Sequence, residues 1–203
     1  MERGGRISDS LGQLAECGLV VNDSGVNPLS GHVTRESVYR LNDNYSRFYL
    51  RYIEPAKESI DRGTFAFGSF DGLEGWDSVM GLQFENLVLA NLAGLVVMLG
   101  LGNVQIVSAA PYRRQASRDG SRKGVQIDLL IQARKSICLV EIKRRREIGR
   151  NVIDEVAEKV ASLPHRRGVT VRTALVYEGH LAPIVEADGY FDAIIPFSKL
   201  LRI

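Results

Sequence analysis

The sequence is poor in the residues that cross-link small secreted proteins or bind structural zinc. Its two cysteines, Cys17 and Cys138, are far apart, which argues against a disulfide framework and favours a reducing, cytoplasmic location. Its three histidines show none of the spacings of zinc ligands. We therefore expect neither a disulfide-stabilised scaffold nor a zinc module.

Long hydrophobic runs are also missing. The longest, residues 87–101, is interrupted by Asn91 and Gly94 and is shorter than the ~20 residues that a membrane helix needs. No hydrophobic segment follows the first residues, so no signal peptide is expected. The composition, 45% hydrophobic and 25% charged over 203 residues, is typical of a globular protein with a sizeable core and no membrane partner.

The net charge of the whole chain is small, but positive charge is concentrated in one segment. The formal net charge is +2, yet residues 112–150 hold twelve Lys and Arg against four Asp and Glu. A basic segment of this kind indicates an anionic partner, with nucleic acid as the first candidate. A solvated, arginine-rich face is the alternative.

Two strand-like segments in this basic region, residues 125–131 and 137–143, are separated by a short polar break. If Arg134 and Lys135 form a two-residue hairpin loop, residues whose numbers add up to 269 lie opposite each other. The loop length therefore predicts the register of the whole hairpin.

This register predicts that Asp128 faces Glu141, and that Lys143 lies on the same side because side chains alternate along a strand. At ~5 Å and an effective dielectric constant of ~20, the two carboxylates repel each other by roughly 3 kcal/mol. A proton or a bound cation would relieve this repulsion.

A third carboxylate, Glu85, lies on a helix predicted over residues 76–99. Its neighbours three and four positions away are non-polar, so Glu85 belongs to the apolar face and needs a partner. One hypothesis is that the helix packs on the sheet and directs Glu85 at Asp128 and Glu141. The alternative is a structural pair with a core arginine or a backbone amide.

Three converging carboxylates form an oxygen-rich site for a hard divalent cation, Mg²⁺ or Mn²⁺. The predicted ligands are Glu85, Asp128, Glu141 and the main-chain carbonyl of Ile142. Lys143 would stabilise charge that develops on phosphorus, or hold the attacking water. The basic residues around the site would contact nucleic-acid phosphates without reading sequence. They are Arg113, Arg114, Arg118, Arg122, Lys123, Arg144, Arg145 and Arg146.

Hydrophobic periodicity and turn residues predict a mixed α/β fold. The first elements are a helix, two strands and a second helix, at residues 7–17, 19–21, 37–41 and 45–60. The later ones follow the order αβββαβ and then αβ, at residues 76–99, 104–109, 125–131, 137–143, 151–163, 169–177, 182–187 and 191–197. Pro111 is expected to end the first strand of this second group.

We expect three parts in the chain. Residues 1–60 resemble the last part of a winged-helix domain with a connecting helix, and we expect the chain to start inside that module. Residues 61–75, which are rich in glycine, form a linker, and residues 76–203 form the main domain.

The predicted site carries a resemblance to a known superfamily, on Asp128, Glu141-Ile142-Lys143 and the helical Glu85. Together with the order αβββαβ, these residues resemble the PD-(D/E)xK nucleases, although Ile127 stands where that family usually has proline. The resemblance implies a restriction-endonuclease-like core and metal-dependent cleavage of phosphodiester bonds.

A second resemblance covers most of the chain. The segment Tyr39–Ile53, followed by Gln83-Phe84-Glu85 and Glu141-Ile142-Lys143, resembles the C-terminal region of archaeal-type P-loop ATPases. In that family a winged helix and a nuclease-like domain follow the ATPase domain. This sequence has no Gly-x-x-x-x-Gly-Lys-Ser/Thr motif, so it should not hydrolyse ATP by itself. The resemblance implies the tail of such a protein, with the ATPase domain as a partner.

Three functions remain open at this point. The first is a Mg²⁺- or Mn²⁺-dependent DNA nuclease domain that holds the backbone of double-stranded DNA. The second is a nuclease fold that binds DNA or a protein without cutting and regulates the ATPase. The third is a protein–protein interaction domain whose acidic residues have structural partners. The oligomeric state is open as well.

Overall fold

The structure, a computed structural model, describes residues 3–120 and 123–201, and the side chains of all of these except residues 3–5, 35 and 36. The chain divides into two compact units. The first comprises residues 1–23 and 38–86, and the second comprises residues 24–37 and 87–203. The linker predicted at residues 61–75 falls inside the first unit, and the predicted domain limits stay a prediction.

The first unit begins with a helix and a two-stranded sheet, as predicted, although both strands are longer than expected. The helix predicted from residue 45 to about 60 is also present, as two α-helical segments joined by a π-helical turn. The elements are α1 (Arg3–Glu16), β1 (Val20–Val26), β2 (Val33–Leu41), α2 (Asn44–Phe48), η1 (Tyr49–Ile53), α3 (Glu54–Asp61), η2 (Phe70–Gly72) and α4 (Trp76–Ala90).

A buried asparagine joins β2 to α4 within the first unit. Asn86 is 4% exposed, and its amide nitrogen donates to the carbonyls of Leu41 at 3.0 Å and Asn42 at 3.2 Å. Arg40 donates to the amide oxygen of Asn86 and also to Asp23, at 2.8 Å. Because buried polar groups are costly without partners, this network determines where α4 meets the end of β2.

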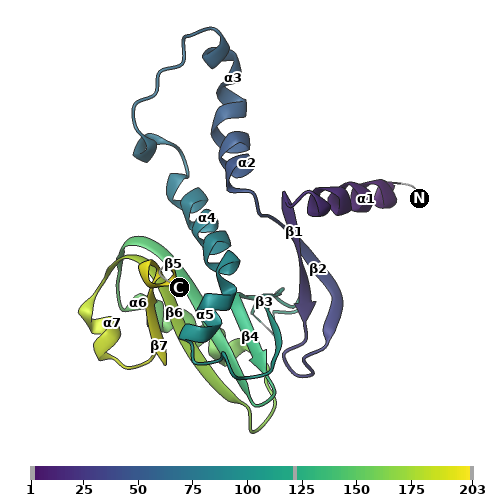
Figure 1. Ribbon diagram of the computed structural model, residues 1–203, viewed down its shortest axis with the longest axis vertical. Helices are drawn as coiled ribbons and strands as arrows, with labels where there is room; N and C mark the ends of the chain where they lie inside the picture. Colours follow the sequence, from purple (N-terminus) through teal and green to yellow (C-terminus); the bar gives the residue numbers. More distant parts are fainter. Residues whose placement is uncertain (1–2, 121–122, 202–203) are drawn as a thin grey trace. The chain divides into compact units, whose positions relative to one another are not determined.

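The second unit is built on a five-stranded mixed sheet in the order β3-β4-β5-β6-β7 (Figure 1). Strand β4 runs antiparallel to both of its neighbours, β3 and β5, whereas β5, β6 and β7 run parallel to one another. Its elements are α5 (Leu92–Met98), β3 (Ile106–Arg114), β4 (Val125–Ala133), β5 (Ser136–Ile148), α6 (Asn151–Ser162), β6 (Thr170–Leu181), α7 (Pro183–Ala187), β7 (Ala193–Pro196) and α8 (Phe197–Leu200). The protein is therefore of the mixed α/β class, as predicted.

The predicted hairpin register is confirmed. Strand β4 ends at Ala133 and β5 begins at Ser136, so the loop has two residues. The pairs from Gln132↔Ile137 to Leu129↔Val140 all follow the predicted register. The ladder stops there, one pair before Asp128 and Glu141.

Several predicted boundaries are wrong: β5 and β6, for example, continue to Ile148 and Leu181, beyond the predicted ends at residues 143 and 177. Strand β3 does not end before Pro111 but continues to Arg114, because β3 is an edge strand and its register with β4 shifts beside the proline. The helix predicted over residues 76–99 is broken at Asn91 into α4 and α5, which are bent by 73°. No single helix among the described residues is long and apolar enough to cross a membrane; α4 and α5 meet that test only when taken together.

Helix α6 packs on one face of the sheet through a stripe predicted from its sequence. Val152 and Val156 are buried against Leu139 and Leu175 in one continuous core. On the other face, Arg172 donates to the carbonyl of Leu99 at the end of α5, at 3.2 Å. Figure 1 shows α5 in front of the sheet and α6 behind it. The sheet is thus covered on both faces.

One glycine is required where β5 bulges away from β6. Gly179 has a φ of +121°, and a Cβ built on it would lie 1.8 Å from the carbonyl oxygen of Arg145. We expect Gly179→Ala to lower the free energy of unfolding by about 3 kcal/mol, measured by urea denaturation. Gly189→Ala is the control, since its backbone is also left-handed but no atom lies within 4 Å; it should cost about 1 kcal/mol. Equal losses would contradict the close approach.

Candidate functional site

The predicted site residues of the second unit lie where β4 and β5 separate. The last backbone pair is Leu129↔Val140. Beyond it, the Oδ2 atom of Asp128 accepts a hydrogen bond from the backbone N–H of Ile142, at 2.9 Å. The carboxylate of Asp128 therefore takes the place of a backbone carbonyl in the ladder. This gives Asp128 a structural role that the sequence did not reveal.

Glu141 is buried between two lysines. Its side chain is 1% exposed, with Oε1 at 2.9 Å from Nζ of Lys143 and Oε2 at 2.5 Å from Nζ of Lys159. The sequence-based interpretation named a proton or a cation as the group that relieves the charge repulsion with Asp128. In the structure two ammonium groups balance the carboxylate of Glu141, and the relief of the repulsion by a bound cation stays a prediction.

Lys143 also contacts a second carboxylate, that of Glu155 on α6, at 2.7 Å. Burial alone would lower the pKa of Lys143, but the charges and hydrogen bonds of Glu141 and Glu155 outweigh burial and raise it above its usual value. Burial likewise tends to raise the pKa of Glu155, and the hydrogen bond and charge of Lys143 outweigh it, so this pKa is lowered. We call Glu141, Lys143, Glu155 and Lys159 the acid–lysine cluster.

Sequence reasoning missed Glu155 and Lys159. They are four residues apart on α6, so they lie on the same side of that helix, next to the buried stripe that contains Val156. An acid and a lysine with this spacing usually form an exposed pair, which is why the signal was weak. The motif at Glu141 and Lys143 gave no indication of the partners on α6.

Glu85 belongs to the first unit and has an arginine in its neighbourhood there. Burial lowers the pKa of Arg47, and the negative charge of Glu85 opposes this effect. Arg47 also donates to the carbonyl of Leu41 at 2.6 Å. This interaction favours the structural alternative for Glu85. That Glu85 joins Asp128 and Glu141 stays a prediction.

The carboxylates are of the ligand type that a hard cation prefers, but they are not arranged as a complete set of metal ligands. Carboxylate oxygens of Asp128 and Glu141 and the carbonyl of Ile142 are the donors that Mg²⁺ and Mn²⁺ prefer. No three His, Cys, Asp or Glu side chains in the described ranges stand close enough together to hold a metal ion. Since both oxygens of Glu141 contact lysines, a cation would compete with these lysines for them, and the predicted cofactor stays a prediction.

Most of the predicted phosphate-binding residues are exposed, and Arg122 lies outside the described residues. Arg113 donates to the side chain of Gln126 at 3.0 Å, and Arg114 donates to the carbonyl of Lys123 at 3.2 Å. Because β4 runs antiparallel to β3 and β5, the loop before β4 and the run Arg144–Arg146 lie at the same end of the sheet as Asp128. Arg118, Lys123, Arg145 and Arg146 are exposed, and Arg114 and Arg144 are half-buried.

Comparisons with known proteins give likenesses to solved structures but no family. No family model and no curated protein matches the chain. It is similar to the crystal structure of protein VC1899 from Vibrio cholerae, with 14% identity and a TM-score of 0.43. The match covers 96% of this chain and 40% of that one, so this chain spans less than half of the length of that protein.

The hydrogen bond from Ile142 predicts how substitutions of Asp128 affect stability. Ile142 is buried, so Asp128→Ala leaves its N–H without an acceptor and should cost about 2 kcal/mol of unfolding free energy. Asp128→Asn keeps an acceptor oxygen and loses a negative charge beside Glu141, so it should cost less than about 1 kcal/mol. Urea denaturation without divalent cations measures both. Equal costs for the two variants would show that this hydrogen bond is unimportant.

Proposed function

We propose that the second unit is a PD-(D/E)xK-type nuclease domain that cleaves the phosphodiester backbone of DNA with Mg²⁺ or Mn²⁺. The observation that carries the proposal is that Asp128, Glu141 and Lys143 gather where two strands separate, among basic residues at the same end of the sheet. Within the second unit, the elements α5, β3, β4, β5, α6 and β6 follow the order αβββαβ of that superfamily. The proposed place of the chain is the C-terminal region of an ATPase-family protein.

The acidic and the basic residues of this site would have different roles. Asp128 and Glu141 would hold the cation through their oxygens, with the carbonyl of Ile142 beside them. A bound Mg²⁺ or Mn²⁺ would supply a water of lowered pKa and polarise a phosphoryl oxygen. Lys143 keeps its proton, because its pKa is raised, and its ammonium group can donate to a phosphate oxygen or orient a water.

The basic residues at this end of the sheet would bind the DNA backbone rather than read its sequence. Arg118 and Arg146 are exposed and can contact phosphates on either side of the cleaved bond. Arg145 is 3.9 Å from Glu155, which is too loose a pair to neutralise either charge. Binding of this kind weakens steeply as salt increases.

A second candidate is a nuclease fold that binds DNA without cutting it and regulates the ATPase domain. The observation that favours it is the complete pairing of Glu141, whose two oxygens each contact a lysine. A carboxylate held in this way stabilises the sheet without a cation. Binding to DNA through the arginines would then remain.

Cleavage of a supercoiled plasmid with Mn²⁺ distinguishes the two candidates. We expect Asp128→Ala and Lys143→Ala each to lower the rate by about 100-fold or more, because they remove a ligand and a charge-stabilising group. Asp154→Ala and Lys135→Ala are matched controls at exposed positions and should cut like the parent. Retarded migration of a DNA fragment, measured at two salt concentrations, reports binding separately.

Cleavage that persists in both Asp128→Ala and Lys143→Ala would rule out this site. If the parent binds DNA in low salt but does not cut it with either cation, the second candidate replaces the first. If it neither binds nor cuts DNA, the arginine-rich face is only a solvated surface, and both candidates are wrong.

A further inference from the structure

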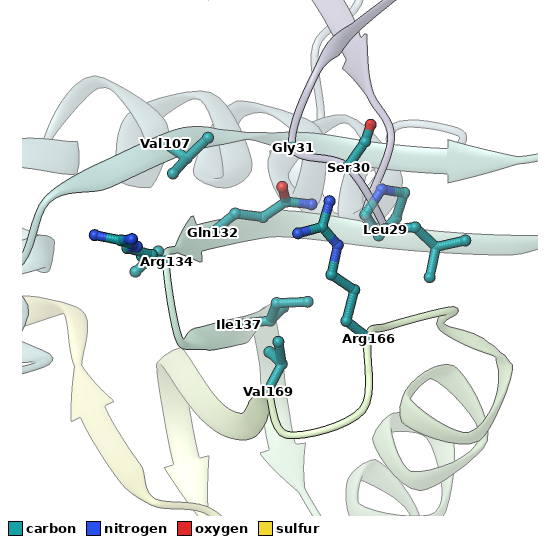
Figure 2. Close-up of a pocket in the computed structure, with 11 residues that line it drawn as sticks. Leu29, Ser30, Gly31, Val107, Gln132, Arg134, Ile137, Arg166 and Val169 are labelled. Carbon is teal, nitrogen blue, oxygen red and sulfur yellow. The ribbon is translucent and has the colours of Figure 1, made fainter.

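The second unit contains a pocket far along β4 from Asp128. Its volume is about 170 Å³, and it lies between the turn that connects β1 to β2, the β4–β5 hairpin and the segment after α6 (Figure 2). Gln132 lines it and is four residues from Asp128, roughly 13 Å along an extended strand. The pocket is therefore separate from the proposed cleavage site.

The side chain of Gln132 lines this pocket, and its amide N–H group makes no hydrogen bond within the described residues. It is 4% exposed, and its amide nitrogen, Nε2, has no hydrogen-bond partner in the part of the chain that the structure describes. A buried donor without an acceptor costs about 1–3 kcal/mol. Such groups are uncommon in native proteins unless something outside the chain satisfies them.

A guanidinium group lies on the same side of the pocket. In Figure 2 the side chain of Arg166 extends from the segment after α6 toward the amide of Gln132. Arg134, in the hairpin loop, also lines the pocket, but in Figure 2 its guanidinium group points away from Gln132. The pocket-lining residues include these two arginines and no carboxylate among the residues described. Positive charge thus lies beside the unpaired donor of Gln132 without a carboxylate to balance it.

The turn between β1 and β2 closes the pocket because it can approach the sheet closely. Gly31 has a φ of +73°, and a Cβ on it would lie 3.1 Å from Val107 and 3.7 Å from the amide oxygen of Gln132. Leu29 and Ile137 supply apolar walls. An apolar enclosure strengthens a charge-assisted hydrogen bond because it excludes competing water.

The volume of the pocket and the positive charge in its lining indicate which kind of ligand it can bind. A volume of about 170 Å³ is the share of roughly five or six waters in the liquid, which suits one small group rather than a whole cofactor. A guanidinium group binds planar or tetrahedral oxyanions through several N–H donors at once, and a phosphate has enough acceptor oxygens for both Arg166 and Gln132.

We propose that this pocket binds a phosphate group, with one oxygen accepting from Nε2 of Gln132 and another accepting from the guanidinium group of Arg166. The phosphate comes either from a free small molecule or from the end of a nucleic-acid strand. The two sources share this chemistry and are separated by experiment. The site does not depend on the proposed cleavage, because none of its residues belongs to the acid–lysine cluster.

Isothermal titration with inorganic phosphate tests the pocket, at constant ionic strength and without divalent cations. We expect saturable binding to the parent chain and at least about tenfold weaker binding to Gln132→Leu, which loses one charge-assisted hydrogen bond. Arg166→Gln should weaken binding by a similar factor, and this position is exposed, so folding is not at risk. The matched control is Arg167→Gln, which removes the same charge next to the pocket and should change binding less than about twofold.

If the parent chain shows no saturable binding of phosphate, the proposal is wrong. It is also wrong if the pocket variant and its control weaken binding equally, because this result indicates unspecific charge attraction. Oligonucleotides with a 5′-phosphate and with a 5′-hydroxyl then identify the source. Tighter binding of the phosphorylated strand that is lost in Gln132→Leu supports a strand end. Equal binding of both strands, with inorganic phosphate still bound through Gln132, supports a free phosphate compound.

Discussion

The burial of Glu141 between Lys143 and Lys159 is the interaction on which the second unit depends. A carboxylate that is 1% exposed would cost several kcal/mol without partners, so its lysines cannot be dispensed with. One lysine comes from the same strand and the other from α6. The ion pairs therefore join the sheet to the helix that covers it and set the position of α6 along β5.

A second interaction, between Asp128 and Ile142, marks the point where β4 and β5 separate. Past Leu129, the side chain of Asp128 rather than a backbone carbonyl accepts the hydrogen bond of Ile142, and the strands separate. Acidic oxygens and a protonated lysine are held at this opening, among exposed arginines. At the other end of β4, the tight hairpin and Gly31 enclose Gln132 instead. One strand thus carries two polar positions with different chemistry.

The sequence predicts those features that depend on local rules. A two-residue loop at Arg134 and Lys135 determined the hairpin register, and apolar periodicity located α6. The ion pair between Lys159 and Glu141 joins residues 18 positions apart, and nothing local indicates it. The break at Asn91 was missed because its neighbours are mostly apolar helix formers, and Asn91 and Gly94 each disfavour a continuous helix by only about 1 kcal/mol or less. Tertiary packing decides such points.

The stability of Lys159→Met, measured by urea denaturation with and without Mn²⁺, tests the central claim most directly. Without metal, the variant leaves one oxygen of the buried Glu141 unpaired and should lose about 3 kcal/mol of unfolding free energy, while Lys199→Met at an exposed position should lose almost none. Mn²⁺ should stabilise Lys159→Met more than the parent, because the cation no longer competes with a lysine. A variant as stable as the parent would contradict the account.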